Sequence, residues 1–424
     1  MKYLIISSDT HAGLPNVEYR DWLDPEHREQ FDESLRMRAA MEEELAKIGL
    51  RNAEFQEEWE AENHDGLRGG WDAAKRDEEL DADGVAGEVI FPDADAVAGG
   101  ASAPFGAGLG SNGASAGPLA LAGAKAHNRW LAELCATSPS RRAGIALVPI
   151  LHDIEAAVAE ITRSAESGLR GGILIPSMWQ PYEPYHSPRY DPIWAACQDL
   201  GMPIHVHSGA APREEFGAHV GLYVAEVRWW STRPLWTLLW SGVFERFPRL
   251  QFVVTECGAF WANDLLWTMD IVYDREHAAK KLGKNLTASL KMRPSEYFDR
   301  NCSIGASNTR RRELARRYEI GVGNLMWGND FPHPEGTWPH TREWLRTQFW
   351  DIPVDETQQI LGTNAAAVYG FDQAALAPLA ERIGPTPEDL DQREDAGLGK
   401  WTDLAAAGRP WLTGKEALPI AERD

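Results

Sequence analysis

Short apolar runs alternate with longer amphipathic stretches along most of the chain. Eight of the runs have the length and composition of buried strands, and segments of helical periodicity separate most of them. This alternation predicts a (β/α)8 TIM barrel with parallel strands, because an open doubly wound sheet would need fewer units and a glycine fingerprint that is absent here. The predicted strands are residues 4–8, 85–92, 143–150, 172–176, 203–207, 251–256, 302–305 and a last strand that begins at Leu325.

Three segments do not fit an ordinary barrel connection. Residues 14–80 are charged and amphipathic, and we expect a helical insertion that covers the barrel mouth as a lid. Residues 96–117 are rich in Ala, Gly and Ser, which predicts a mobile loop. The barrel should therefore occupy residues 1–371. Residues 372–424 should form a C-terminal arm on the surface of the barrel or of a neighbouring subunit, the latter in a homo-oligomer.

Composition excludes several classes of protein. The chain has 424 residues, 43% of them hydrophobic, and no apolar run of membrane-spanning length, so we expect a globular protein without a membrane partner. A net charge of -22 also disfavours nucleic acid. The four cysteines lack the paired spacing of a disulfide framework or zinc knot. Met1 leads almost directly into a strand, which leaves no room for a signal sequence and predicts a cytoplasmic enzyme.

Metal-ligand residue types close four of the predicted strands. In a barrel of parallel strands the carboxyl ends form the active face, so these side chains should converge. Residues at i and i+2 point to one side of a strand and can hold one ion together. Unpaired charges at these buried ends would be costly, which favours a metal site. The predicted ligands are Asp9 and His11 after strand one, His207 after strand five, Glu256 after strand six, and Asp330 and His333 after strand eight.

Further residues around this face have two interpretations. His333 and Glu335 lie in a proline-bounded loop, where they fit either metal ligands or hydrogen-bonding supports. His205 is a supporting residue or an ordinary core histidine, and Asn329 is a supporting residue. The catalytic roles fall to Asp330, Glu256 and His333.

The chain contains 18 tryptophans, and several fall just beyond predicted strand ends or in nearby loops. Aromatic walls there would suit a bulky hydrophobic substrate, although for any single tryptophan a place in the core is favoured. We expect substrate contacts from Trp179, Trp229, Trp230 and Trp261.

Four stretches carry a resemblance to known proteins: Ser8–His11, Gly242–Gly258, Gly328–Gly336 and Ile360–Ala366. They are similar to the amidohydrolase-related family (amidohydrolase 2), which includes metal-dependent carboxy-lyases such as aminocarboxymuconate semialdehyde decarboxylase. The likeness covers about residues 1–371 and implies a TIM barrel with metal at the strand ends.

Two departures from that family change the expected chemistry. The decarboxylases carry a His-x-His pair on strand one, where this chain has Asp9 and His11, and a histidine after strand six, where it has Glu256. Carboxylates in place of imidazoles suit iron or manganese better than zinc, and carboxylates can bridge two ions.

The resulting pattern resembles a branch of TIM-barrel non-haem di-iron monooxygenases from diterpenoid biosynthesis. That resemblance implies two Fe ions, O2, an electron donor, and hydroxylation of a bulky terpenoid or acyl substrate, with coenzyme A thioesters among the candidates.

A redox-neutral hydrolase or decarboxylase of the amidohydrolase superfamily is the alternative. It would use one Zn or Mn ion, with Asp330 or Glu256 as general base. A barrel that binds a ligand without catalysis is disfavoured, because so dense an ionisable cluster is costly unless it is used.

Overall fold

Eight parallel strands form one sheet in the order of the sequence, as the TIM-barrel prediction requires. The computed structural model describes residues 1–47, 53–93, 103–212, 215–216, 219–279 and 289–391. Asp330 N donates to Asp9 O at 2.9 Å and His11 N donates to Phe331 O, so the segment after β8 joins β1 and nearly closes the barrel. The strands are β1 Ile6–His11, β2 Gly87–Phe91, β3 Arg142–Leu147, β4 Gly172–Leu174, β5 Ile204–His207, β6 Phe252–Thr255, β7 Cys302–Ser307 and β8 Leu325–Gly328.

Helices cover the outside of the strands, so nearly every strand residue is buried on either face. Asp153 caps α5 as its sequence position predicts, since its carboxylate accepts from Ala156 N at 3.0 Å. In the described part of the chain, no helix combines the length and apolarity needed to cross a bilayer. The longer barrel helices are α4 Pro118–Ala136, α5 Ile154–Glu166, α6 Asp191–Leu200, α7 Val220–Trp240, α9 Phe260–Ala279, α10 Pro294–Asn301 and α13 Thr341–Phe349. The shorter ones are α8 Val243–Arg246, α11 Arg311–Leu314, α12 Arg317–Ile320, α14 Val354–Gln358 and α15 Asn364–Tyr369.

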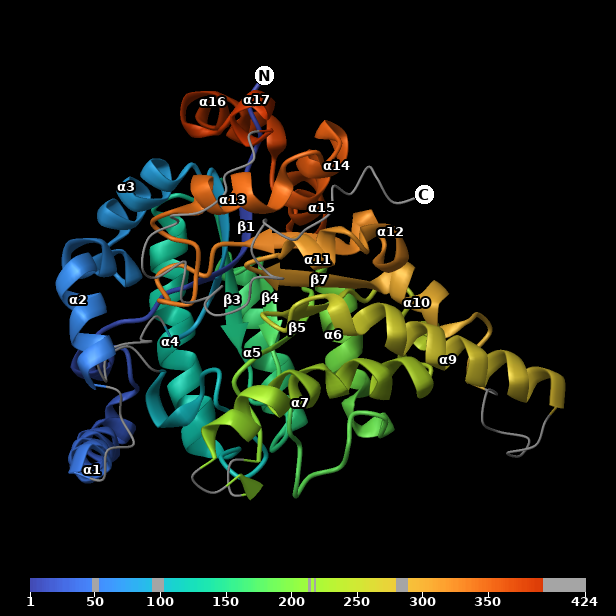
Figure 1. Cartoon of the computed structure of the whole chain (residues 1–424). Helices are drawn as coiled ribbons and strands as arrows, with labels where there is room; N and C mark the ends of the chain where they lie inside the picture. The colour runs from blue at the N-terminus through green and yellow to red at the C-terminus, as the bar shows by residue number, and fades with distance from the viewer. Residues whose placement is uncertain (48–52, 94–102, 213–214, 217–218, 280–288, 392–424) are drawn as a thin grey trace.

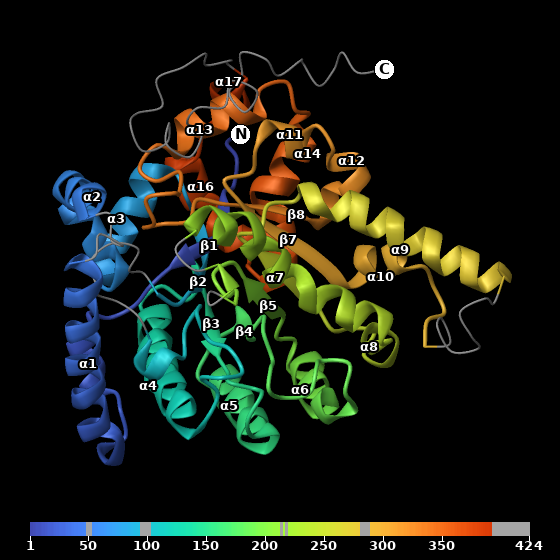
Figure 2. The same cartoon turned by 60° about the horizontal axis from the view of Figure 1, so that its bottom comes forward.

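The segment after β1 contains α1 Arg28–Lys47, α2 Ala53–Leu67 and α3 Ala73–Asp83, which lie together along one side of the barrel (Figures 1 and 2). A buried ion pair holds α3 against the strands. Arg76 on α3 donates to Glu88 of β2 at 2.6 Å, and neither side chain is exposed. The same guanidinium donates to the backbone oxygen of His11 at 2.8 Å, so the insertion is fixed to a strand that carries predicted ligands.

The C-terminal helices α16 Gln373–Ile383 and α17 Pro387–Leu390 lie near the N-terminus (Figure 1). Tyr3 N donates to Pro385 O at 2.8 Å, which joins the two ends of the described chain. The rest of the predicted arm, residues 392–424, and residues 96–102 of the predicted mobile loop lie outside the described residues. The division into a barrel, a lid and an arm stays a prediction.

Candidate metal centre

The polar residues that end β1, β5, β6 and β8 meet at the carboxyl ends of the strands. Within the described residues, three triads each bring ligand atoms within 4.8 Å of one another. The triads share members, so they form one continuous cluster: Asp9, His11 and His207; His11, Asp330 and His333; and Glu256, Asp330 and Glu335. All six predicted ligands belong to it, together with Glu335.

Two of the carboxylates owe their position to an uncommon backbone conformation. Glu256 follows β6 with φ of 56°, and Asp330 follows β8 with φ of 57°. The left-handed region is disfavoured for residues with a Cβ, and such residues collect at functional sites where the surroundings hold them in place. The turn ends each strand at its carboxylate.

Backbone carbonyls fix the tautomer of all three clustered histidines. His11 Nδ1 lies 2.7 Å from Pro92 O, His207 Nδ1 lies 2.9 Å from Ser208 O, and His333 Nε2 lies 3.0 Å from Asp93 O. A carbonyl oxygen can only accept, so each of these nitrogens carries the proton. The other nitrogen of each neutral ring therefore presents a lone pair.

These lone pairs point at carboxylates rather than at donors. His11 Nε2 lies 3.1 Å from Asp330 Oδ1, His333 Nδ1 lies 3.1 Å from the same oxygen, and His207 Nε2 lies 3.3 Å from Asp9 Oδ1. In the described part of the chain, neither carboxylate oxygen of Asp330 has a conventional hydrogen-bond partner. Two lone pairs face each other favourably only with a cation or a proton between them.

The donor set fits a divalent cation. Metal bonds of about 2.1 Å at right angles would place neighbouring ligand atoms roughly 3 Å apart, close to the separations observed. Imidazole nitrogens with carboxylate oxygens suit manganese, iron or zinc, and the hydrogen bonds to backbone carbonyls are the kind that orient metal-binding histidines. Asp9, His11, His207 and Asp330 are the residues best placed to hold such an ion.

Without a cation, the cluster balances its charge with protons. Burial disfavours the imidazolium form, but the neighbouring carboxylates outweigh it and raise the pKa of His11, His207 and His333. Burial and the charge of Asp330 raise the pKa of Glu256 to about 8. A bound cation must therefore displace protons from the imidazoles.

A polar network positions the cluster from behind. Ser307, at the end of β7, donates to Asp9 Oδ2 and leaves Asp9 Oδ1 to face the histidines. Asn329 accepts from Ser7 Oγ at 2.9 Å and donates to Asp83 at 3.1 Å, so it ties the β8 loop to β1 and to α3. Ser307 was not predicted from the sequence, because β7 continues to Ser307 while the predicted strand ended at residue 305, and serine was not among the ligand types that marked the other residues.

His205 and Glu335 lie on opposite sides of the cluster, His205 deeper in the barrel and Glu335 at the open side. His205 is fully buried deeper in the barrel, where its Nε2 lies 3.0 Å from Gly171 O and its ring stacks on Tyr369. Burial lowers the pKa of His205 to about 3, so the ring is neutral. Glu335 is exposed at the open side of the cluster beside Glu256, whose side chain is 23% exposed.

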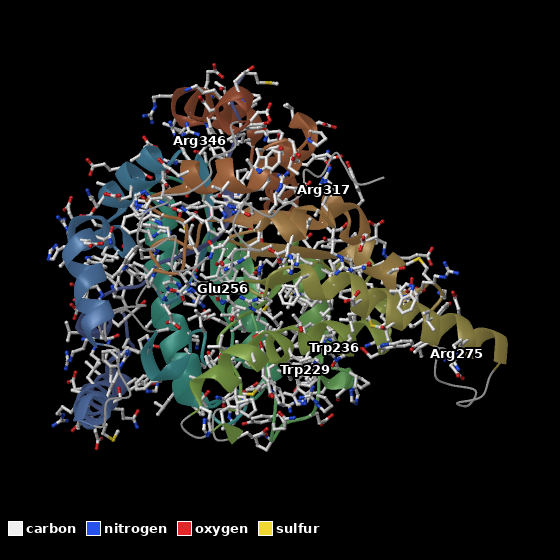
Figure 3. The ribbon with its side chains drawn as sticks, viewed as in Figure 1. Trp229, Trp236, Glu256, Arg275, Arg317 and Arg346 are labelled. Carbon is white, nitrogen blue, oxygen red and sulfur yellow. The ribbon has the colours of Figure 1, made fainter. Side chains whose placement is uncertain are left out.

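Three of the four predicted tryptophans gather around one arginine. Trp179, Trp229 and Trp230 surround the guanidinium of Arg233, at 4.6, 5.9 and 5.3 Å from its central carbon. Trp229 and Trp261 also line a groove between α7 and α9. Figure 3 shows Trp229 along α7, apart from Glu256. Their role in substrate binding stays a prediction, and Arg233 is a neighbour that sequence spacing could not reveal.

Comparison with known proteins identifies a family and two related decarboxylases. A model of the amidohydrolase family matches residues 59–371. The gamma-resorcylate decarboxylase of Rhodococcus jostii (strain RHA1) is 27% identical over 272 residues, which span 59% of this chain and 77% of the relative. The gamma-resorcylate decarboxylase of Rhizobium sp. (strain MTP-10005) is 26% identical over 269 residues, with the same coverage of each chain.

Solved structures show the same fold. The 5-carboxyvanillate decarboxylase LigW from Sphingomonas paucimobilis superimposes with a TM-score of 0.61 and 21% identity, over 87% of this chain and 99% of that one. A dihydroxybenzoic acid decarboxylase from Polaromonas sp. JS666, solved with bound manganese, gives a TM-score of 0.59 and 18% identity, over 88% and 99% of the chains.

These relatives overturn the predicted monooxygenase. The sequence relatives are decarboxylases of aromatic acids, which supports the redox-neutral alternative and contradicts an iron-dependent oxygenase. The predicted pair of Fe ions, O2, the electron donor and the coenzyme A thioester lose their support with it. The error has a physical cause: hard nitrogen and oxygen donors bind manganese and iron alike, so a ligand set does not identify the reaction.

Proposed function

Because the chain belongs to the amidohydrolase family, we propose that it is a metal-dependent decarboxylase of an aromatic carboxylic acid. The observation that carries the proposal is the set of three histidines whose lone pairs face buried carboxylates at the strand ends. We infer one divalent cation, with manganese as the first candidate because related structures hold it.

Asp9, His11, His207 and Asp330 would hold the ion. When bound, the ion would supply positive charge that orients the carboxylate of the substrate and stabilises electron density on its oxygen atoms. The supporting contacts keep Asp9, His11 and His207 in place before substrate arrives, because Ser307 and the backbone carbonyls already occupy their outward-facing atoms.

Glu256 is the residue we assign to proton delivery. Loss of CO2 breaks the bond between the ring carbon and the carboxyl carbon, leaves the electron pair on the ring carbon, and requires one proton there. Before a cation binds, burial and the charge of Asp330 raise the pKa of Glu256 to about 8, so its carboxyl group can carry a proton at neutral pH. Its partly exposed side chain lies at the open side of the cluster, where substrate can enter.

The test is CO2 release from gamma-resorcylate and 5-carboxyvanillate by protein loaded with Mn²⁺. We expect one CO2 per product molecule, and in D2O one deuterium at the ring position that lost the carboxyl group. Protein that carries a full complement of manganese and releases no CO2 from either acid, or from a panel of other hydroxybenzoates, would refute the proposal.

The Glu256→Gln variant separates two roles for this residue. As proton donor, Glu256 should be dispensable for metal binding, and its loss should lower turnover roughly 100-fold or more. If the variant instead loses its manganese, Glu256 is a metal ligand, as the sequence analysis expected, and the proton must come from another group.

A further inference from the structure

A groove lies between α1 and the segment that leads from β2 to α4, two helices that Figure 2 shows beside each other. Its volume is about 380 Å³, within the range of about 300–1000 Å³ that small-molecule sites span. The apolar walls are Phe31 and Leu35 of α1 and Ala103, Pro104 and Phe105 of the segment after β2. We call this feature the α1 groove.

Asp93 joins the α1 groove to the metal cluster. It follows β2 at the carboxyl end of the strands and lines the groove. Its backbone oxygen lies 3.0 Å from His333 Nε2, and its carboxylate accepts from Ala103 N at 2.8 Å and from Leu109 N at 2.7 Å. One residue therefore orients a histidine of the cluster and shapes a wall of the groove. A molecule held at the cluster has the groove as its neighbour.

Phe105 is held in a strained conformation against α1. Its backbone has φ of 55° and ψ of 27°, the left-handed region that bulky residues seldom enter. Its ring meets the ring of Phe31 edge-on, with 5.8 Å between the centroids and 75° between the planes. Strain of this kind persists only where surrounding contacts hold it, and it collects at ligand sites. Here it places an aromatic ring in the wall of the groove.

The polar side chains of the lining already have partners within the protein. Ser34 Oγ donates to Phe31 O at 2.7 Å, and both carboxylate oxygens of Asp93 accept from backbone N–H groups. The remaining polar residues are engaged as well: Asn16, Arg38 and Ser115. A ligand group in the groove would thus meet aromatic and aliphatic walls and gain few hydrogen bonds, which favours an apolar group.

We propose that the α1 groove binds an apolar substituent of the substrate. This inference rests on the proposed function: the carboxylate of the aromatic acid lies at the metal cluster, and an alkyl or aryl group on its ring fills the groove. The substrate is then a substituted aromatic acid rather than a plain dihydroxybenzoate. Helix α1 precedes residues 59–371, which match the amidohydrolase family, so its wall is an addition to the part of the chain that the family shares.

The experiment is isothermal titration calorimetry on the full chain loaded with Mn²⁺. The two probes are 2,6-dihydroxybenzoate and 4-hexyl-2,6-dihydroxybenzoate, which differ only in an apolar chain opposite the carboxylate. We expect the hexyl acid to bind roughly 30-fold more tightly or better, because the groove removes the chain from water.

Two variants fill the groove from α1. Leu35→Trp and Ser34→Phe, made separately, should each bring the dissociation constants of the two acids within about threefold of each other, because the added side chain takes the space of the hexyl group. The matched control is Met37→Trp. Met37 lies on the same helix, is 62% exposed and stands outside the lining, so this variant should keep the preference for the hexyl acid. Circular dichroism must show that all three variants are folded like the wild type.

Equal affinity of the wild type for the two acids, or no binding of either, would overturn the proposal. So would a preference for the hexyl acid that survives both groove variants, since the chain would then bind elsewhere, for example in the groove between α7 and α9. The readout is binding rather than turnover. A protein that binds the hexyl acid as expected and releases no CO2 from it would refute the decarboxylase alone.

Discussion

Asp330 shows how much of the site depends on single residues. Its backbone turns into the left-handed region directly after β8, and its buried carboxylate faces both His11 and His333. A non-glycine residue in this conformation costs on the order of 1–3 kcal/mol, which the hydrogen bond from Asp330 N to Asp9 O helps to offset. The strained backbone places the carboxylate of Asp330 opposite the lone pairs of His11 and His333, an arrangement that favours a cation between them.

Asp330→Asn should remove metal binding. The amide keeps the shape of the side chain but loses its charge, so we expect manganese affinity to fall by 100-fold or more and turnover to be abolished. Metal analysis after gel filtration measures this. Asp153→Asn, at the exposed cap of α5, is the control and should bind metal normally, because Asn caps a helix as well as Asp does. Full occupancy in Asp330→Asn would mean that the ion lies elsewhere.

His127 is a residue-scale determinant of stability away from the metal cluster. It is fully buried on α4, and its Nδ1 lies 2.8 Å from the hydroxyl of Tyr19. Burial lowers its pKa from 6.5 to about 3, so the folded protein keeps this ring neutral while the unfolded chain protonates it below pH 6.5. The unfolded state then binds more protons, and the free energy of unfolding must fall as the pH falls.

This linkage predicts a measurable pH dependence. Between pH 7.5 and pH 5, His127 should contribute a loss of about 2 kcal/mol in the free energy of unfolding. Urea unfolding of His127→Gln should show a correspondingly smaller loss over that range, although the variant is less stable at pH 7.5. His186→Gln, on an exposed loop, should leave the pH dependence unchanged. Identical pH profiles for His127→Gln and the wild type would contradict the assignment.

At the scale of elements, the helical insertion is anchored through α3. The guanidinium of Arg76 contacts Glu88, Thr10 and the backbone oxygen of His11, and none of these side chains is exposed. The contacts fix α3 to β1 and β2 beside the metal cluster. A lid that moves must therefore move in α1, α2 or the loops, because opening α3 would expose a buried ion pair without its partner.

A double-mutant cycle tests this anchor. Arg76→Met leaves Glu88 with a hydrogen bond from Thr10 at 3.0 Å and the longer ion pair with Arg142 at 3.3 Å, and we expect it to destabilise the protein by about 3 kcal/mol. Arg76→Met combined with Glu88→Met should recover much of that loss, because no unpaired charge remains. Urea unfolding measures both. Arg20→Met, which breaks the half-exposed pair with Asp32, should have a much smaller effect on stability than Arg76→Met. Strict additivity in the Arg76–Glu88 cycle would rule out the anchor.

At the scale of the whole molecule, the barrel supplies a stable frame and the cation stabilises the cluster within it. The strands are almost entirely buried and pack against large apolar clusters, so we expect that the fold does not depend on metal. The arrangement of the cluster does depend on a cation or on bound protons, because without them its carboxylates and imidazole lone pairs repel one another.

Manganese should therefore raise the thermal midpoint of the protein without changing its fold. At a concentration 1000 times the dissociation constant, binding adds about 4 kcal/mol to the free energy of unfolding, which should raise Tm by several degrees. The rise should be smaller at pH 5 than at pH 7.5, because protons compete for the lone pairs of His11, His207 and His333. Calorimetry with and without chelator measures it. An equal rise in Asp330→Asn would show that manganese acts at another site.

The sequence alone determined the barrel and the identity of the clustered residues. Apolar runs and their spacing are local properties, and the carboxyl ends of parallel strands necessarily share one face. This is why Asp9, His207 and Asp330, which lie far apart along the chain, could be assigned to one cluster in advance.

Only the tertiary structure decided how those residues act. The left-handed turns at Glu256 and Asp330, the carbonyls that fix three histidine tautomers, and the placement of Trp229 and Trp261 on an outer groove depend on contacts between distant segments. The types of ligand residue did not identify the reaction either, since one set of nitrogen and oxygen donors can serve oxidation and decarboxylation alike. Residue pattern fixes where a carboxylate lies along the chain, and packing fixes what it faces.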